Sequence, residues 1–517
     1  MVSGPSSKFS VSSSLILGVF AVAWAAIVSL ACVPWFIRLL GIESYGLIGF
    51  YVTLQAAVGL LDLGLGATIN REVARSAALD DLDRARRLLR SLEFVYTVVA
   101  ITVFVAIAFA APLIADKWLG PSTLDRADMN LAIGMMGLVA ALRWPISLYL
   151  GTLIGLQRAQ VSYRLTATMA TVSNVGAVLV LLYVDRTIWA YFVWQSAAAL
   201  LYVIWARWSA WRTLGGSHSA RFDGGLLGGV LIRSAVMSGV AMSGLILTQL
   251  DKFMVSSSTA LADFGRYSLA VVLASGLSVL IIPTFNIIYP RLSALFAAGE
   301  PAERIRFYRL GTRLFLSCLF PIALSAFFYA RDLLLLWTGD ASLAMAAAPI
   351  AGLLCLGAAL NGMMHFPYAL QLAAGRTKLP LLINCAMLAI MLPLALVLVK
   401  QYGALGGAIS VLSLNAIYVV IGVTVTHVYL LPGLQKQWMF RDVAPALIVA
   451  TVIVSAGDHL VTMTALGPVL RLAFATICSL AATAILLFVY RDARYVLREA
   501  WSAATARLRS VKREAIS

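Results

Sequence analysis

Among the ionisable side chains inside long apolar stretches of this 517-residue chain, five are of types and in positions that point to the binding of ions. They are Asp62, Arg143, Asp251, Lys252 and His365. A charged group within a membrane costs free energy, so it either marks a substrate or ion pathway or serves as a partner within the fold. The four histidines show no metal-ligand spacing, and the sequence has no CxxC pair. The pattern therefore predicts neither a metal site nor a bound cofactor.

Arg143 lies in the segment LRWPISLY, near the middle of an apolar stretch. Pro145 follows two residues later and should kink the helix, because proline removes a backbone hydrogen bond and clashes with the preceding turn. A guanidinium offers a rigid fork of donors that matches phosphate oxygens. We therefore expect Arg143 to bind a phosphate of the substrate. The alternative is a structural partner for a carbonyl group or a buried acid.

His365 lies in the segment MHFPYALQ, in a later apolar stretch. The order His365-Phe366-Pro367 repeats the basic, aromatic and proline order of residues 143–145. This parallel predicts a second substrate-binding group that faces Arg143 across a pseudo-twofold axis. A hydrogen-bonded packing histidine is the alternative.

Three further charges have open roles. Asp251 and Lys252 are adjacent, and neighbouring residues on a helix point about 100° apart. We expect Lys252 to bind substrate and Asp251 to neutralise a neighbouring lobe, or the two to join an interhelical ion pair at an outer gate. Asp62, in LLDLGLG, is a candidate for binding a coupling proton or sodium ion, or for holding an inner gate. Hydrogen bonding to the backbone at a helix break is its structural alternative.

The elements that position these residues are membrane helices. The chain is 61% hydrophobic and 12% charged, against about 45–50% and about 25% in soluble domains. Roughly 20 apolar residues cross the hydrocarbon core, and its lack of water favours helices. The hydropathy predicts fourteen spans, at 11–34, 44–66, 93–114, 129–155, 165–184, 187–206, 235–258, 266–288, 310–330, 342–372, 380–399, 404–430, 443–462 and 466–489.

The distribution of Lys and Arg predicts the orientation of the spans. With the N-terminus inside, 29 of these residues fall in cytoplasmic segments and 8 in outer segments. This asymmetry predicts cytoplasmic N- and C-termini. It also accounts for the net charge of +16 without a nucleic-acid partner. The longest internal connections, near 67–92 and 207–234, are expected on the cytoplasmic side. The basic tail should either lie along the membrane surface or extend into solvent.

Similar residues recur 219 positions apart, which indicates an internal repeat. Six spans separate the two copies, so both copies run in the same direction. We therefore expect an all-α polytopic membrane protein with two parallel six-helix lobes around a central cavity. The lobes should cover 1–210 and 211–432, followed by two extra helices at 433–490 and a tail at 491–517. The matching pairs are Tyr45-Gly46 with Phe264-Gly265, Trp118 with Trp337, Tyr149 with Tyr368, and Tyr183 with Tyr402.

Three segments resemble a known family: RLLGIESYGLIGFYVTLQAAVGLLDLGLGATINREVA, LTQLDKFMVSSSTALADFGRYSLAVVLASGL and YGALGGAISVLSLNAIY. They are similar to polysaccharide-biosynthesis flippases, the Wzx-type O-antigen or exopolysaccharide translocases of the multidrug/oligosaccharidyl-lipid/polysaccharide exporter superfamily. The resemblance implies flipping of an undecaprenyl-pyrophosphate-linked oligosaccharide from the cytoplasmic to the periplasmic leaflet of the bacterial inner membrane. It also implies functional partnership with a polysaccharide polymerase and glycosyltransferases.

Other functions remain as alternatives. A multidrug or lipid II exporter of the same fold is one, although fourteen spans favour glycolipid transport over drug export. A membrane-embedded polysaccharide polymerase or ligase is another, but the outer loops are short and carry no paired carboxylates. The absence of a GxxxxGK[ST] loop excludes a P-loop ATP-driven pump within this chain.

Overall fold

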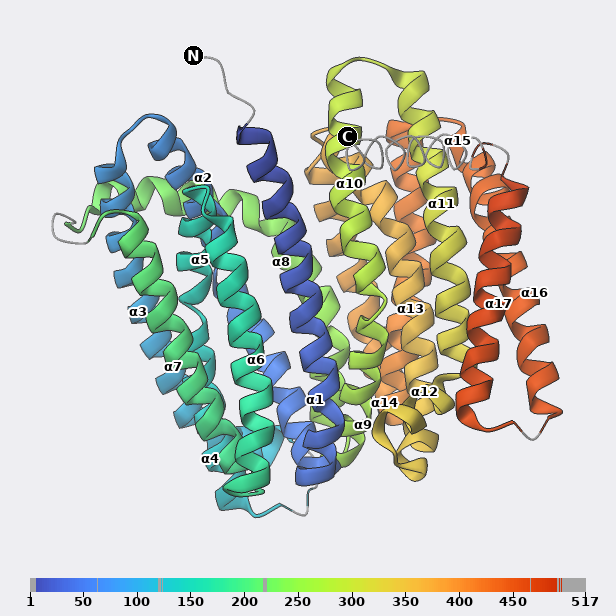
Figure 1. Cartoon of the computed structure of the whole chain (residues 1–517), viewed down its shortest axis with the longest axis horizontal. Coiled ribbons are helices and arrows are strands. Elements are labelled where there is room, and N and C mark those ends of the chain that lie inside the picture. Colours follow the sequence, from blue (N-terminus) through green and yellow to red (C-terminus); the bar gives the residue numbers. More distant parts are fainter. Residues whose placement is uncertain are drawn as a thin grey trace, which may run out of the picture. The chain divides into compact units, whose positions relative to one another are not determined.

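A computed structural model describes residues 6–490 except 63, 120, 121, 123, 217–220 and 465, and also residues 492 and 494. Regular structure in this part of the chain is helical throughout (Figure 1). The predicted surface tail at 491–517 lies almost entirely outside the described residues. The first half of the chain contains α1 (Ser6–Gly59), α2 (Leu65–Ala78), α3 (Leu82–Leu113), α4 (Arg126–Arg143), α5 (Ile146–Gly155), α6 (Ala159–Tyr183), α7 (Ile188–Thr213) and α8 (Gly224–Ser258).

The second half has the same character. It contains α9 (Leu261–Ser275), α10 (Ser278–Ala297), α11 (Pro301–Phe328), α12 (Ala330–Thr338), α13 (Ala341–Ala373), α14 (Lys378–Leu430), α15 (Leu434–Gln437), α16 (Ala444–Thr462) and α17 (Pro468–Val489). Shorter helical turns adjoin these elements at η1 (Leu60–Asp62), η2 (Ile114–Trp118) and η3 (Trp438–Val443). Asp340 caps α13, and its bonds to the backbone N–H groups of Leu343 and Ser342 lower its pKa.

The helices follow the order of the fourteen predicted spans, although the span predicted at 266–288 covers the end of α9 and the start of α10. Eleven helical stretches among the described residues are long and apolar enough to cross a membrane. Two of them, in α1 and α14, each contain two helices that meet at a glycine with positive φ, Gly41 at 81° and Gly403 at 58°. Helix α8 occupies the seventh predicted span. The predicted all-α polytopic membrane fold is therefore confirmed.

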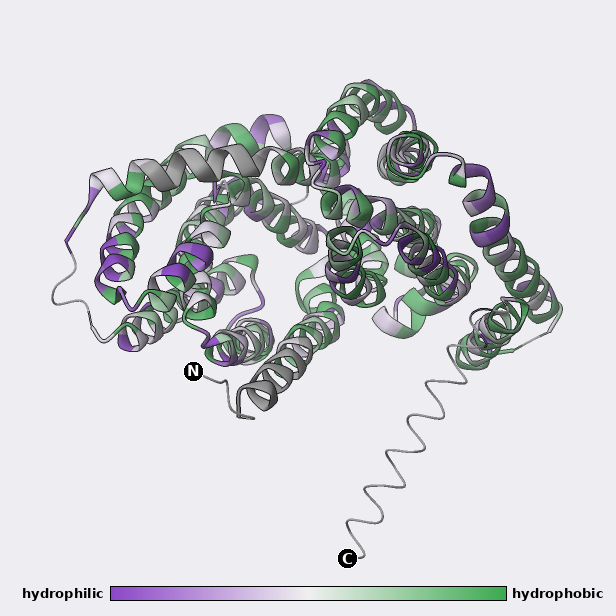
Figure 2. Ribbon diagram, turned by 90° about the horizontal axis from the view of Figure 1, so that it is seen from above, coloured by the Kyte–Doolittle hydropathy of each residue, from purple (hydrophilic) through white to green (hydrophobic). Residues whose placement is uncertain are grey.

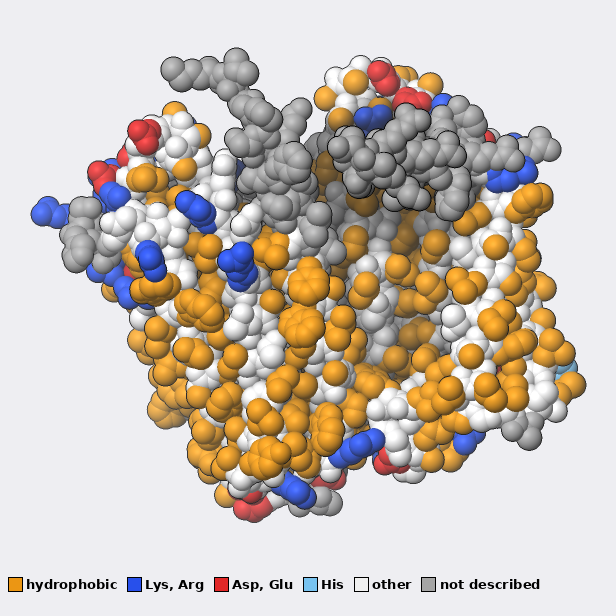
Figure 3. Space-filling model, viewed as in Figure 1, with side chains coloured by type: hydrophobic (Ala, Val, Ile, Leu, Met, Phe, Trp, Pro, Cys, Tyr) orange, Lys and Arg blue, Asp and Glu red, His pale blue; other side chains and the backbone are white. Residues whose placement is uncertain are grey.

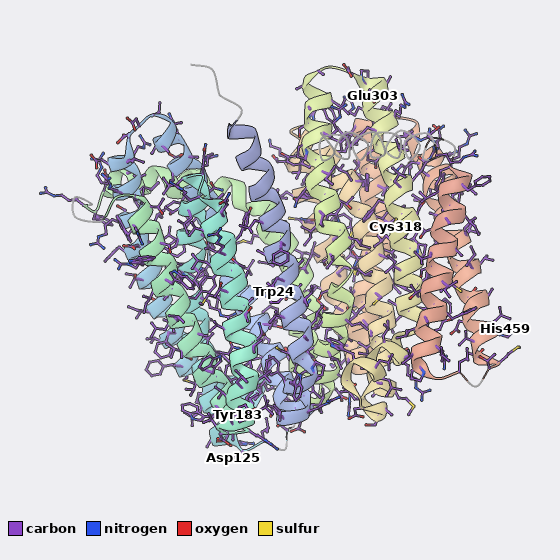
Figure 4. The ribbon with its side chains drawn as sticks, viewed as in Figure 1. Trp24, Asp125, Tyr183, Glu303, Cys318 and His459 are labelled. Atoms are coloured by element: carbon purple, nitrogen blue, oxygen red, sulfur yellow. The ribbon has the colours of Figure 1, made fainter. Side chains whose placement is uncertain are left out.

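Hydrophobic residues dominate the helices (Figure 2), and their side chains cover much of the visible surface of each unit (Figure 3). Exposed apolar patches of this extent mark a surface that contacts lipid. In unit 1, defined below, Asp125 and Tyr183 lie at the same end of the helices (Figure 4). Asp125 precedes α4 and Tyr183 ends α6. The chain therefore crosses unit 1 through α4 and α5 and returns to the same end through α6.

The chain forms two compact units. Unit 1 contains Met1–Ser268 and Ala395–Ala404, and unit 2 contains Leu269–Leu394 and Leu405–Ser517. This division follows compactness, whereas the predicted lobes at 1–210 and 211–432 follow the repeat. The lobe boundaries, the extra helices at 433–490 and the tail at 491–517 stay predictions.

The two longest predicted connections are shorter than expected because their flanking helices continue into them. Between α2 and α3 only residues 79–81 lie outside helix. Helix α2 persists because it buries Ile69 and Val73, and Asp81 caps α3 by accepting the Arg84 N–H at 3.0 Å. Similarly, α7 continues to Thr213 and α8 begins at Gly224.

The repeated aromatic-glycine motif lies at a close helix crossing within unit 1. A Cβ atom on Gly46, in α1, would lie 2.5 Å from the carbonyl oxygen of Leu261. Conversely, a Cβ atom on Gly265, in α9, would collide with the carbonyl oxygen of Ile42. Gly46 and Gly265, which are 219 positions apart, also face each other, since a Cβ atom on either would lie 3.3 Å from the backbone nitrogen of the other. Only glycine allows the backbones to approach this closely.

Candidate functional site

Two helix breaks in unit 1 define the candidate site. Helix α1 ends at Gly59 and gives way to η1, and α2 starts after Gly64, whose φ is 71°. Helix α4 ends at Arg143, and α5 begins after Pro145. The predicted kink at Pro145 is thus an interruption of the helix. Broken helices expose unpaired backbone groups, and transporters use such breaks to bind ions and substrates.

Close backbone packing holds the two breaks together. A Cβ atom on Gly151, in α5, would lie 2.5 Å from the carbonyl oxygen of Gly66, in α2. One turn further, a Cβ atom on Gly155 would lie 2.6 Å from the carbonyl oxygen of Asn70. These glycines let α2 and α5 approach, and the approach brings Ser147 to Asp62.

Asp62 accepts hydrogen bonds from three groups at these breaks. The donors are the Tyr96 hydroxyl, the Ser147 hydroxyl at 3.2 Å and the Gly66 N–H at 3.3 Å. The carboxylate lies at the N-terminus of α2, where the helix dipole favours negative charge. This geometry matches the structural role considered for Asp62, and it also places a half-buried carboxylate where a coupling cation could bind.

Arg143 lies beside the same cluster because Trp144 stacks on Tyr96, with ring centroids 4.4 Å apart. Its Nη2 donates to Gln195 Oε1 at 3.0 Å and to Ser173 Oγ at 3.3 Å. Both partners are neutral, and no carboxylate pairs with Arg143 in the described part of the chain. Within the described structure, neutral groups alone therefore bind the guanidinium at the break.

Three buried polar atoms around Arg143 have no hydrogen-bond partner within the described structure. They are the Nε of Arg143, the Nε1 of Trp144 and the hydroxyl oxygen of Tyr51. Buried donors are nearly always paired in proteins, so unpaired ones require an explanation such as a bound water or ligand. The Tyr51 ring meets the edge of Phe192 on α7, with centroids 5.7 Å apart, about one turn before Gln195. A bound group that accepted a hydrogen bond from any of these atoms would satisfy it.

Asp251 and Lys252 pair with each other, although adjacent helical positions diverge. The Lys252 side chain folds back, so Nζ lies 3.3 Å from Asp251 Oδ1 and 2.6 Å from the Thr248 carbonyl oxygen. The Tyr267 hydroxyl, on α9, donates to the buried Asp251. The ion pair thus lies within α8 and is not interhelical as one alternative had it. The lysine side chain is long enough to reach Asp251 although adjacent positions of a helix point about 100° apart. The roles of both residues stay predictions.

His365 lies in α13 of unit 2. Its Nδ1 bonds to the carbonyl oxygen of Asn361 at 3.0 Å, and its ring meets the edge of Phe285 at 5.6 Å between centroids. Pro367 does not interrupt α13, unlike its counterpart Pro145. Arg143 and His365 belong to different units, so their mutual approach stays a prediction.

Glu93 is a buried acid that the sequence reasoning did not single out. Its Oε1 accepts hydrogen bonds from Tyr149 Oη at 3.0 Å, Arg207 Nε at 3.0 Å and Trp211 Nε1 at 2.7 Å. Arg90 reaches Oε2 at 3.3 Å. The spacing of Arg90 and Glu93 was a detectable local signal, but the partners on α7 were not predictable from spacing.

A second unpredicted cluster surrounds Asp442 in unit 2. Arg309 donates to both carboxylate oxygens, at 2.7 and 2.9 Å, and Arg313 Nε donates to Oδ1 at 2.7 Å. The Tyr490 hydroxyl donates to the Asp442 carbonyl oxygen at 2.8 Å. Burial raises the pKa of Tyr490 to about 12. The cluster fastens η3 and the end of α17 to α11. No group of three or more metal-ligating side chains occurs among the described residues.

The fold is shared with solved structures of membrane transporters. The fold matches that of the lipid II flippase MurJ in an inward closed conformation, with a TM-score of 0.69, 14% identity, and coverage of 92% of this chain and 99% of that one. It also matches an inward-facing multidrug resistance MATE family transporter of the MOP superfamily, with a TM-score of 0.67 and 13% identity, over 80% of this chain and 96% of that one. At such identities the likeness concerns the fold alone.

The chain belongs to the polysaccharide biosynthesis protein family, whose sequence profile matches residues 12–296. It is also 22% identical over 407 residues to a putative O-antigen transporter of Shigella flexneri. That alignment covers 78% of this chain and 94% of the relative. The resemblance drawn from the sequence is therefore confirmed at the level of the family.

Proposed function

We propose that this protein flips a polyprenyl-pyrophosphate-linked oligosaccharide from the cytoplasmic to the periplasmic leaflet by alternating access. The observation that carries the proposal is Arg143 at a helix break, where it forms no ion pair with a carboxylate among the described residues and keeps a buried Nε without a partner. A diphosphate needs concentrated cationic donors, whereas a cationic drug needs acidic partners. Membership in the polysaccharide biosynthesis family supports a glycan as the cargo.

In this proposal Arg143 holds the pyrophosphate through the donor that its own fold leaves free. Gln195 and Ser173 occupy Nη2, so they orient the guanidinium while its Nε stays unpaired. A phosphate oxygen that accepts from Nε would satisfy this buried donor. Release on the outer side requires moderate affinity, which one guanidinium with neutral neighbours supplies better than a cluster of cations.

The other predicted residues have secondary roles in the proposal. His365 and Lys252 contribute further substrate contacts, and Asp251 serves in coupling or gating through its ion pair with Lys252. The Tyr96 and Ser147 hydroxyls hold Asp62 in place, and its carboxylate binds and releases a coupling proton or sodium ion. The protein would act in the bacterial inner membrane with both termini in the cytoplasm, between glycosyltransferases and a polysaccharide polymerase.

Flipping can be tested in proteoliposomes that contain the purified protein and a lipid-linked oligosaccharide with a fluorescent sugar. Membrane-impermeant dithionite, added outside, should first quench the outer-leaflet sugars, and then the sugars that the protein brings from the inner leaflet. Protein-free liposomes provide the baseline. Quenching that stops at the outer-leaflet fraction, with and without a proton or sodium gradient, would refute the proposal. Efflux of a cationic dye by the same vesicles would instead support drug export.

A further inference from the structure

Unit 2 carries a cluster of aromatic rings on α10 and α13, which pack side by side (Figure 1). Phe285 stacks on Tyr289 and Tyr368, with centroids 5.9 and 5.7 Å apart, and meets His365 edge-on at 5.6 Å. None of the four side chains is fully buried. We call Phe285, Tyr289, His365 and Tyr368 the aromatic patch.

Polar amides accompany the aromatic patch on the same two helices. Asn361 lies one turn before His365, and Asn286 follows Phe285, and both are exposed despite their apolar helices. Asn361 Nδ2 donates to Asn415 Oδ1 at 3.1 Å, and this bond orients its amide. Polar side chains within membrane helices normally face protein or a water-filled surface. The patch and its amides therefore suit contact with a hydrated ligand better than contact with lipid tails.

The aromatic patch occupies the repeat position of the charged site in unit 1. Phe285 follows Gly66 by 219 residues, and His365 follows Arg143 by 222. Gly66 donates its N–H to Asp62, whereas its counterpart in the repeat, Phe285, presents an aromatic ring within α10. Both copies carry aromatic rings, but unit 1 adds a cation and a carboxylate, whereas unit 2 adds amides and a histidine.

Sugar rings match the chemistry of the aromatic patch and its amides. Each ring presents weakly positive C–H groups on one face, which suit the negative face of an aromatic ring. Its hydroxyl groups suit amides, which both donate and accept hydrogen bonds. A pyrophosphate would gain little here, because the patch contains no arginine or lysine.

We propose that the aromatic patch binds sugar rings of the transported glycan, with Phe285 and Tyr368 as the stacking platform and Asn361 as the hydroxyl partner. The inference rests on the proposed function and adds a subsite to it. The phosphate end and the sugar end of the cargo are then recognised by different chemistry. Residues of the aromatic patch therefore determine which sugars are accepted, whereas Arg143 binds the phosphate end and does not select the sugar.

The test uses the full-length protein in nanodiscs with two separate probes. The sugar probe is a set of neutral saccharides, namely glucose, galactose, N-acetylglucosamine, maltose and chitobiose, followed by saturation-transfer NMR. The phosphate probe is farnesyl pyrophosphate, followed by calorimetry. Phe285→Leu and Tyr368→Leu should each weaken sugar binding by about two- to tenfold, the range of one aromatic contact. Both variants should bind farnesyl pyrophosphate normally, and Phe285→Trp should retain sugar binding.

Controls separate the subsite from general packing and from the proposed function. Phe109→Leu removes an exposed aromatic ring of unit 1 and should leave both probes unaffected. Tyr289, also exposed, supplies Tyr289→Leu if Phe285→Leu fails to fold. Wild-type protein that binds none of the saccharides, or leucine variants that bind them normally, would overturn the inference and leave the proposed function standing. If wild-type protein does not bind farnesyl pyrophosphate, the result would instead count against the proposed function.

Discussion

At the scale of single residues, Arg143 and Asp62 differ in how many of their polar atoms have hydrogen-bond partners. Asp62 has three donors around its carboxylate. Arg143 has only neutral acceptors on Nη2 and none on Nε. A satisfied carboxylate can serve the fold alone, but a buried unpaired donor costs free energy that a ligand would recover. Arg143 is therefore the stronger candidate for contact with the cargo.

Arg143→Ala should abolish glycan export, because a hydrogen bond to a charged group contributes about 1.5–3 kcal/mol, or about ten- to a hundredfold in binding. Arg143→Lys should retain part of the export, since the charge survives but the fork is lost. His365→Ala should have a milder effect. Complementation of surface polysaccharide in a deletion strain measures export, with membrane abundance checked by immunoblot. Arg126→Ala, at an exposed ion pair, is the control. Full export by Arg143→Ala at normal abundance would remove Arg143 from the site.

Asp62→Asn should impair transport and leave membrane insertion intact. The asparagine can still accept from Ser147 and Gly66, but it cannot bind a coupling proton or sodium ion as a carboxylate does. Transport assays in proteoliposomes across a range of pH and sodium concentrations measure the effect. Tyr96→Phe, which removes one donor to Asp62 and keeps the charge, should be milder. Normal transport by Asp62→Asn under every condition would assign Asp62 to the fold.

At the scale of elements, glycines decide where helices meet. Gly46 and Gly265 bring α1 and α9 into backbone contact, and Gly151 and Gly155 bring α5 onto α2. Each glycine faces a carbonyl oxygen that cannot move away independently of its helix. These positions set the distance between elements, and so they set the geometry of the helix breaks.

Gly46→Ala should destabilise the protein by about 1–3 kcal/mol, the usual cost of overpacking, because the new Cβ would press on the Leu261 carbonyl. Gly134→Ala is a matched control, since nothing lies within 4 Å of its added Cβ and alanine favours helix. Thermal unfolding in detergent, followed by fluorescence, compares the two variants. Equal melting temperatures for Gly46→Ala and wild-type protein would show that the crossing can relax.

At the scale of the whole molecule, the distribution of charge orients the chain in the membrane. The asymmetry of Lys and Arg places the α2–α3 turn, the α10–α11 turn and the C-terminus on one predicted side. An even number of spans requires both termini on the same side, and the parallel repeat depends on this number.

Fusions to a pair of reporters should place both termini and the turn at residues 79–81 in the cytoplasm. A cytoplasmic reporter such as green fluorescent protein should be active at the C-terminus, and alkaline phosphatase should be inactive there. A phosphatase fusion after residue 124, in the predicted outer connection between η2 and α4, is the positive control. Phosphatase activity at the C-terminus would contradict the predicted topology.

Composition and local pattern alone determined the class of the protein and the position of its helices. A chain with 61% hydrophobic residues must satisfy its backbone internally within lipid, so helices follow without tertiary information. The break at Pro145 was also predictable, because a missing N–H is a local property. Likewise, the repeat was visible as matching residues at one offset.

Only the tertiary structure decided which polar groups meet. Hydropathy places a helix in the membrane but does not determine its rotation about its own axis. Asp442 meets two arginines 129 and 133 residues earlier, and Glu93 meets Arg207 and Trp211 on α7. The unpaired donors beside Arg143 and the folding back of Lys252 onto Asp251 depend in the same way on the packing of neighbouring helices. Sequence spacing cannot specify such contacts, because they depend on the rotation and depth at which distant helices pack.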